Sequence, residues 1–128
     1  MNGAGQFAAV PAAAPAANAK AETWLWIAQR ASAAVLALCV LVHLVTIIYA
    51  VRHGLTGAAI LGRTRGNAPA LAFYSLYVLA IAVHAPIGLR TLCREWLGWR
   101  SASLNWVMAA VALALFAFGL RAGWAVFA

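Results

Sequence analysis

Three long apolar runs dominate this chain and limit what it can fold into. They cover about residues 24–51, 69–92 and 104–127. At ~1.5 Å per helical residue, each run is long enough to cross a hydrocarbon core of ~30 Å. Lipid offers no partner for unpaired backbone groups, so each run must be helical. We therefore predict an all-α integral membrane protein whose three transmembrane helices form part of a helix bundle.

The composition argues against a soluble domain. Hydrophobic residues make up 66% of the chain and charged residues only 9%, whereas soluble domains carry about 25% charged residues. The net charge of +7 would suit a soluble basic domain with a nucleic-acid partner. However, the Lys and Arg residues occur singly, mostly near the ends of the apolar runs, and form no basic stripe. We interpret them as anchors at the membrane edges and predict no nucleic-acid partner.

The segments outside the apolar runs have the composition of tails and loops. Residues 1–22 are rich in Ala and Pro without the charged start and apolar stretch of a secretory signal, and are predicted to be a disordered tail. Residues 23–128 form the predicted transmembrane domain. Residues 52–68 and 94–103 carry Gly and Arg, which is typical of water-exposed connections. The six Trp residues lie near the ends of the runs, as in an aromatic belt. Cys39 and Cys93 have no metal-ligand spacing and imply no disulfide framework.

The basic residues favour one orientation in the membrane by five to four. Three spans place the two ends of the chain on opposite sides. One side would hold Lys20, Arg30, Arg90, Arg94 and Arg100, and the other Arg52, Arg63, Arg65 and Arg121. Cytoplasmic segments carry the excess of Lys and Arg, so we predict a cytoplasmic amino terminus.

Two histidines lie within the apolar runs. An ionisable residue inside a span is costly and is a functional hypothesis by default, although a histidine can also simply bond a neighbouring helix. His84 shares a helix face with Ala80 and Gly88, and His43 lies on a face with Cys39 and Ser32. Such flat faces would let a haem macrocycle lie against the helix while the imidazole reaches its iron, but small-residue stripes also serve plain helix packing. The bundle is therefore predicted to bind haem, with His43 and His84 as axial ligands.

The depths of the two histidines imply separate haem positions. His43 lies nineteen residues after Trp24, ~28 Å along the helix, and His84 lies eight residues before Leu92, ~12 Å from the same side. An offset of ~16 Å is too great for both rings to bind one iron. The chain therefore has two haem positions, or one haem and one histidine that does not bind it. The second axial ligand must come from another polypeptide, because His53 is in the polar loop, where it is most simply a surface residue.

A few polar residues near the span ends are further candidates. Arg90 lies where the second helix meets the interface and could pair with a haem propionate or simply snorkel to the membrane edge. Gln29, Arg30 and Ser32 form a polar cluster in the first turns of the first helix, at a depth suited to a quinone headgroup. Capping or packing is the alternative for this cluster. Arg121, near the far end of the third run, is interpreted as an anchor.

These residues occur in a pattern that resembles a known family. The segments QRASAAVLALCVLVHL (29–44) and YSLYVLAIAVHAPIGLRTLCREWLGW (74–99) are similar to the histidine-bearing helices of the cytochrome b membrane-anchor subunits of succinate dehydrogenase and fumarate reductase. The resemblance covers about residues 24–124. The matching positions are Gln29, Ser32, His43, His84, Gly88 and Arg90.

The resemblance implies haem b held by two histidines, with His84 at the haem nearer an iron–sulfur subunit and His43 at the distal one. Ser32, Gly88 and Arg90 would be further cofactor-binding residues. It also implies flavoprotein and iron–sulfur subunits docked on the cytoplasmic face of a bacterial-type inner membrane, quinone as the electron-transfer substrate, and either a second anchor chain or a second copy of this chain. In a symmetric dimer, His43 would pair with His43 of the second copy, and His84 with His84 of the second copy.

The chain also departs from the dihaem anchors. It has three spans rather than five, and Ala33 and Ala82 stand where those anchors often carry a glycine and an acidic residue. Monohaem anchors also contain a three-helix chain with a similar histidine motif, so one haem or two remains open. The expected function is a haem b anchor that passes electrons between the iron–sulfur subunit and quinone, without catalytic residues of its own. A haem-free anchor is the alternative. A transporter would need more polar residues along its spans.

Overall fold

The computed structural model describes residues 16–128, which fold into four α-helices. They are α1 (Ala16–His53), α2 (Gly57–Thr64), α3 (Ala68–Trp96) and α4 (Ala102–Phe127). The three long helices are each apolar and long enough to cross a membrane. Residues 16–128 contain no strand. The predicted all-α fold with three transmembrane helices is therefore confirmed.

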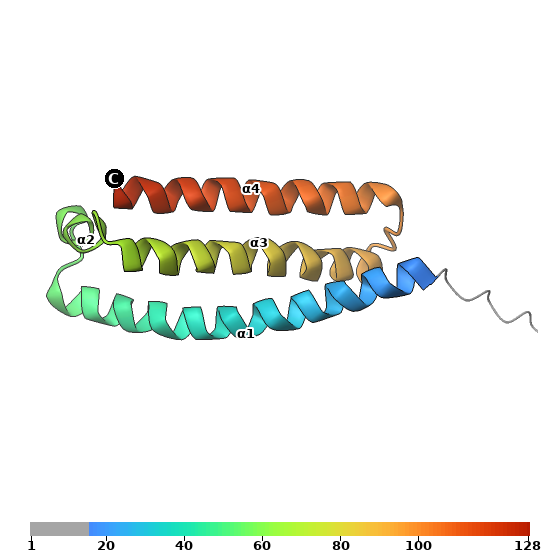
Figure 1. The fold of residues 1–128 in the computed structure, drawn as a ribbon, viewed down its shortest axis with the longest axis horizontal. Helices are drawn as coiled ribbons and strands as arrows, with labels where there is room; N and C mark the ends of the chain where they lie inside the picture. Colours follow the sequence, from blue (N-terminus) through green and yellow to red (C-terminus); the bar gives the residue numbers. More distant parts are fainter. Residues whose placement is uncertain (1–15) are drawn as a thin grey trace, which may run out of the picture.

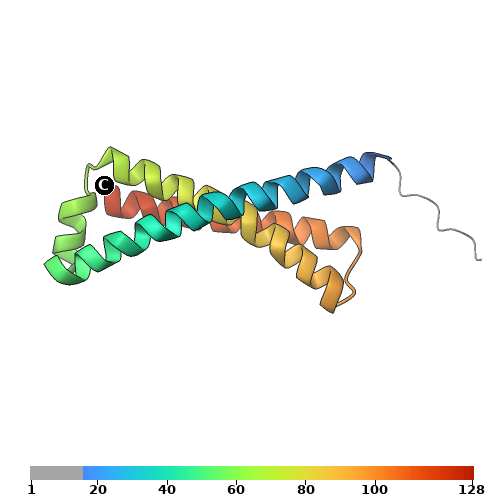
Figure 2. The same ribbon diagram turned by 90° about the horizontal axis from the view of Figure 1, so that it is seen from below.

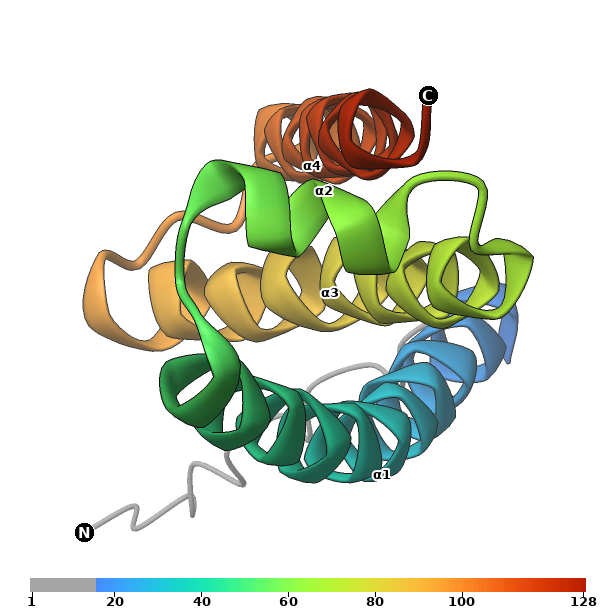
Figure 3. The same ribbon diagram turned by 90° about the vertical axis from the view of Figure 1, so that its left-hand side faces the viewer.

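The three long helices run antiparallel, with α3 between α1 and α4 (Figures 1 and 3). α1 crosses α3 at a clear angle, so the two helices diverge toward their ends (Figure 2). The start of α1, the end of α3 and the start of α4 lie at one end of the molecule, called here the first end. The short helix α2 lies at the other end, beside the end of α4 (Figure 1).

The first helix begins earlier than the sequence suggests. α1 starts at Ala16, so residues 16–22, assigned above to the tail, are helical; residues 1–15 lie outside the described part of the chain. Its 38 residues correspond to ~57 Å, well beyond a hydrocarbon core of ~30 Å. The first turns of α1 therefore reach beyond the apolar span. At the other end α1 includes His53, which lies in its last turn rather than in a loop.

The connection predicted for residues 52–68 contains the helix α2. Gly54 has φ of 115°, a left-handed conformation that favours glycine, and the chain reverses there. Thr56 then caps α2, because its side-chain oxygen accepts a hydrogen bond from the backbone N–H of Ala59 at 3.2 Å. Arg63 donates to the carbonyl oxygen of Gly54 at 2.7 Å and closes the turn. These local bonds explain why a Gly-rich connection is ordered.

The segment after α2 also terminates α4. The Thr64 hydroxyl donates to the carbonyl of Val126 at 2.8 Å, and the Gly66 N–H donates to the carbonyl of Phe127 at 2.9 Å. The last carbonyls of a helix lack partners within the helix and need such donors. The α2 connection therefore fixes one end of α4.

The helices bury few side chains within the chain itself. α3 and α4 pack through Cys93, Leu104 and Met108, with Trp99 against them. Large apolar side chains elsewhere on the helices, such as Leu38 and Phe118, are exposed. Such outward apolar surface suits a chain that faces lipid or other membrane subunits.

Candidate functional site

His84 on α3 faces Ser32 on α1. The His84 Nδ1 and Ser32 Oγ atoms are 3.4 Å apart, and Ser32 is 7% exposed. The Ser32 hydroxyl donates its own proton to the Gln29 backbone carbonyl at 3.1 Å. With that proton committed to the carbonyl, the Ser32 oxygen is available to accept from His84, an arrangement that requires the tautomer with the imidazole proton on Nδ1. The other nitrogen of His84, Nε2, is then the one with a lone pair for a metal.

Gln29 and Gly88 meet one turn further along the same interface. A Cβ atom on residue 88 would lie 3.2 Å from the Gln29 side-chain nitrogen, so glycine leaves room for that amide. The Gln29 Oε1 atom is buried and accepts no hydrogen bond in the described part of the chain. A buried acceptor without a donor costs free energy, and a ligand that donates a hydrogen bond at this place would remove that cost.

Gln29 also lines a small cavity between α1 and α3 at the first end. The cavity has a volume of about 320 Å³, and Arg90, Trp26 and Thr91 are among its other lining residues. Gln29 and Arg90 therefore line the same cavity. This volume is at the lower end of the range of about 300–1,000 Å³ for small-molecule sites.

Arg30 lies apart from the other two members of the predicted polar cluster. Its guanidinium carbon is 5.0 Å from the centre of the Trp26 ring, and the residue is exposed. Gln29 and Ser32 turn instead toward α3. The structure therefore brings together two of the three residues assigned to a quinone headgroup.

His43 lies further along the α1–α3 interface, against two tyrosines. The centroid of its ring is 5.9 Å from that of Tyr74 and 5.8 Å from that of Tyr77. Its Nδ1 atom is buried and has no hydrogen-bond partner among residues 16–128. Eleven residues of α1 separate Ser32, which pairs with His84, from His43, which is ~16 Å along the axis. This spacing agrees with the offset expected from the sequence.

The third histidine, His53, has a different environment. It is exposed, its ring stacks on Tyr49 with centroids 4.1 Å apart, and its Nδ1 bonds the Tyr49 carbonyl at 2.9 Å. It lies at the opposite end of the molecule from His84. It is a local contact of the last turn of α1.

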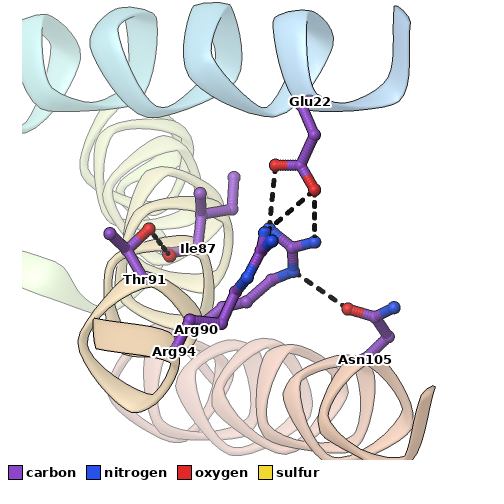
Figure 4. Close-up of polar contacts among 6 residues, drawn as sticks. All are labelled: Glu22, Ile87, Arg90, Thr91, Arg94 and Asn105. Atoms are coloured by element: carbon purple, nitrogen blue, oxygen red, sulfur yellow. Dashed lines mark hydrogen bonds and ion pairs between the residues drawn. The ribbon is translucent and has the colours of Figure 1, made fainter. Parts of the chain in front are cut away.

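Arg90 takes part in a charged network that joins the three long helices (Figure 4). It donates to both Glu22 oxygens, at 2.7 and 3.1 Å, and to the Asn105 side-chain oxygen at 2.9 Å. Arg94 donates to the same carboxylate at 3.0 Å. We call these four residues, Glu22, Arg90, Arg94 and Asn105, the interface network.

Two members of this network were not predicted from the sequence. Glu22 lies in the predicted tail and Asn105 at the start of the third run, and neither was considered as a partner of Arg90. Their side chains meet because α1 extends back to Ala16 and α4 starts beside the end of α3. Glu22 is one of only two acidic residues in a chain with nine basic ones, and that scarcity was the available signal.

The described residues suit the iron of a haem better than a bare metal ion. Residues 18–128 hold no group of three or more His, Cys, Asp and Glu side chains able to bind a bare metal ion. A haem supplies four nitrogens and needs only axial ligands from protein. The Nε2 of His84 fits that requirement. On His43 the Nδ1 atom is enclosed by the chain, which leaves Nε2 as the candidate donor.

Comparison with known proteins decides the family. The profile of the succinate dehydrogenase/fumarate reductase transmembrane subunit family matches residues 12–120. The chain belongs to this family. No match was found among curated proteins or among solved structures. As a member of the family with three spanning helices, the chain is a multi-pass membrane protein, and the family implies association with flavoprotein and iron–sulfur subunits.

Proposed function

We propose that this chain is the haem b membrane-anchor subunit of its complex and passes electrons between the iron–sulfur subunit and membrane quinone. The observation that supports this most is the contact of His84 Nδ1 with the buried Ser32 hydroxyl. A metal-bound histidine commonly donates its other ring N–H in this way, which fixes its tautomer and orientation.

The residues around His84 would each have a distinct role. His84 would bind the iron through Nε2, and Ser32 would hold the ring from behind. Gly88, one turn further along α3, leaves room for the Gln29 amide beside the histidine. Bound haem b would supply one-electron chemistry at its iron. The opposing axial ligand would come from a second anchor chain or a second copy of this one.

His43 is proposed as the ligand of a second haem in the other half of the membrane. Its ring is held between Tyr74 and Tyr77 and its buried Nδ1 lacks a partner. A histidine that only cross-linked two helices would be expected to bond through that atom. At ~16 Å from the level of His84, it requires its own iron.

The small cavity beside Gln29 is proposed as the quinone headgroup site. The reduced headgroup carries hydroxyls, and the unpartnered Gln29 Oε1 is a suitable acceptor for one of them. Arg90 lines the same cavity and has donors left over after its bonds to Glu22 and Asn105. We assign Ser32 to the histidine rather than to the quinone, and Arg30 to the membrane interface.

The soluble subunits are proposed to dock at the first end, on the cytoplasmic side. This end holds five basic residues, Lys20, Arg30, Arg90, Arg94 and Arg100, against four at the other end, which supports a cytoplasmic amino terminus. His84 and the quinone cavity would then be the sites nearer the iron–sulfur subunit.

The test is the haem content of the complex purified with its partner subunits. His84→Ala and His43→Ala should each remove a separate part of the reduced-minus-oxidised haem spectrum. His53→Ala is the matched control and should leave the spectrum intact. A wild-type complex without Soret absorbance would instead favour a haem-free anchor. A spectrum unchanged by both substitutions would show the ligand assignment to be wrong.

A further inference from the structure

A second and larger cavity adjoins the cavity beside Gln29, and Glu22, Leu25, Ile87 and Arg90 line both. It is an open groove of about 790 Å³ between the first turns of α1, the second half of α3 and the first half of α4. The groove exists because α3 packs against both neighbours while α1 diverges from it toward the ends (Figure 2). His84, Ser32 and Gly88 are not among its lining residues. It is therefore separate from the proposed haem position.

The lining of this groove changes from polar to apolar along its length. At the first end it contains Asn18 and the whole interface network. Further into the span its walls are small or apolar residues: Ala82, Val83, Pro86, Met108, Ala109 and Ala112. Ala82 and Arg94 are twelve residues apart on α3, so the gradient extends over ~18 Å. A ligand that matches it needs a polar head at the membrane interface and an apolar tail in the hydrocarbon.

The charges of the groove favour an anionic head. Two arginines share the single carboxylate of Glu22, which leaves one positive charge in excess. Arg94 lines the groove, uses one nitrogen for Glu22 and has a side chain that is 39% exposed, so it has further donors available to a ligand. A phosphodiester carries one negative charge and accepts such donors well. An uncharged quinone headgroup would leave the excess positive charge without a negative partner.

We propose that this groove binds one anionic phospholipid of the surrounding bilayer. Its phosphate would contact Arg94 at the membrane interface, and one acyl chain would lie along Ala109 and Ala112 against α3. The lipid would complete the packing between α1 and α4 at the end where the soluble subunits are proposed to dock. This assignment stands without the haem proposal, because His84 and Ser32 do not line the groove.

The test measures lipid retained by the complete complex, purified with its partner subunits. The complex is placed in nanodiscs of phosphatidylcholine with or without phosphatidylglycerol, and a phosphatidylglycerol probe with a photoreactive acyl chain is added. We expect the probe to label residues of the groove in α3 and α4. Arg94→Gln should reduce labelling about fivefold, which corresponds to the loss of one basic residue near a lipid surface. The control is Arg121→Gln, the same substitution at the end of the molecule opposite to the groove, and it should leave labelling unchanged.

A second pair of variants tests the apolar part of the groove. Ala109→Leu fills it, whereas Ala110→Leu changes the neighbouring residue, which does not line the groove. Only Ala109→Leu should reduce labelling, and co-purification of the partner subunits with each variant reports whether the complex is intact. The proposal is overturned by equal labelling with a phosphatidylcholine probe. It is also overturned if a cysteine at residue 109 cross-links to a partner helix, or if a photoreactive quinone, rather than the lipid probe, labels Ala109 and Ala112, which do not line the cavity beside Gln29.

Discussion

At the scale of single residues, Ser32 is the side chain whose role can be tested most sharply. Removing a partner of a metal-bound histidine typically weakens metal binding 10- to 100-fold. We therefore predict that Ser32→Ala lowers haem affinity by about tenfold, measured as the rate and extent of haem transfer to an excess of apomyoglobin. Ser32→Thr keeps the hydroxyl and should retain most of the affinity. Equal losses in both variants would point to packing rather than to the hydrogen bond.

Glu22 gives a second prediction at this scale. Its carboxylate bonds two arginines of α3, but its side chain is 49% exposed, so each pair is partly screened by solvent. Glu22→Gln should lower the free energy of unfolding by about 0.5–1 kcal/mol, measured by thermal unfolding in detergent. The loss should shrink at high salt.

The control for Glu22 is the other acidic residue of the chain. Glu95 is exposed and forms no ion pair within residues 16–128. Glu95→Gln should therefore be neutral. A loss as large as that of Glu22→Gln would show that the interface network has no special role in stability.

At the scale of helices, the approach of α3 and α4 depends on a glycine. A Cβ on residue 119 would lie 2.5 Å from a methyl carbon of Val78, closer than real atoms approach. We predict that Gly119→Ala destabilises the protein by about 1–3 kcal/mol, the usual cost of overpacking. Reversible unfolding in mixed micelles would measure it.

Two further variants separate packing from backbone effects at this contact. A Cβ on residue 123 would meet nothing within 4 Å, so Gly123→Ala should cause no loss of stability. Adding Val78→Ala to Gly119→Ala should restore part of the lost stability, because it removes the clashing methyl groups. If Gly123→Ala costs as much as Gly119→Ala, the close approach of α3 and α4 is not the cause.

The presence of the three long helices could be predicted from the sequence because a lipid environment permits few other backbone structures. Apolar length alone predicted α1, α3 and α4, and all three are present. The ends were less predictable. Residues 16–22 have high helix propensity but no apolar run, and the helix they form is held by the contact of Glu22 with α3. α2 was missed because its order depends on local caps and on bonds to the end of α4.

For the candidate site residues, the sequence predicted which ones lie within the spans. It did not predict the direction in which each side chain points. The small faces around His43 and His84 were visible as spacings in the sequence. The separation of Arg30 from Gln29 and Ser32, and the pairing of Arg90 with Glu22, depend on how α1 crosses α3. That angle is set by contacts far apart in the chain, which no local pattern contains.

At the scale of the whole molecule, the three helices have exposed apolar faces, and the candidate haem ligands have no opposing ligand within the described residues, which fits a subunit of a larger complex. His84 lies on α3 at the level of Ser32 on α1, which is ~16 Å along α1 from His43, so the two candidate ligands cannot face one iron. Each proposed iron must therefore be shared with a second membrane chain. The rest of the proposal depends on this claim of shared ligation.

Electron paramagnetic resonance of the oxidised, purified complex tests that claim most directly. The account predicts low-spin ferric haem signals in the wild type. His84→Ala should convert one of them to a high-spin signal or abolish it, and added imidazole, which can enter the space left by the side chain, should restore the low-spin form. A low-spin spectrum unaffected by His84→Ala would contradict the account.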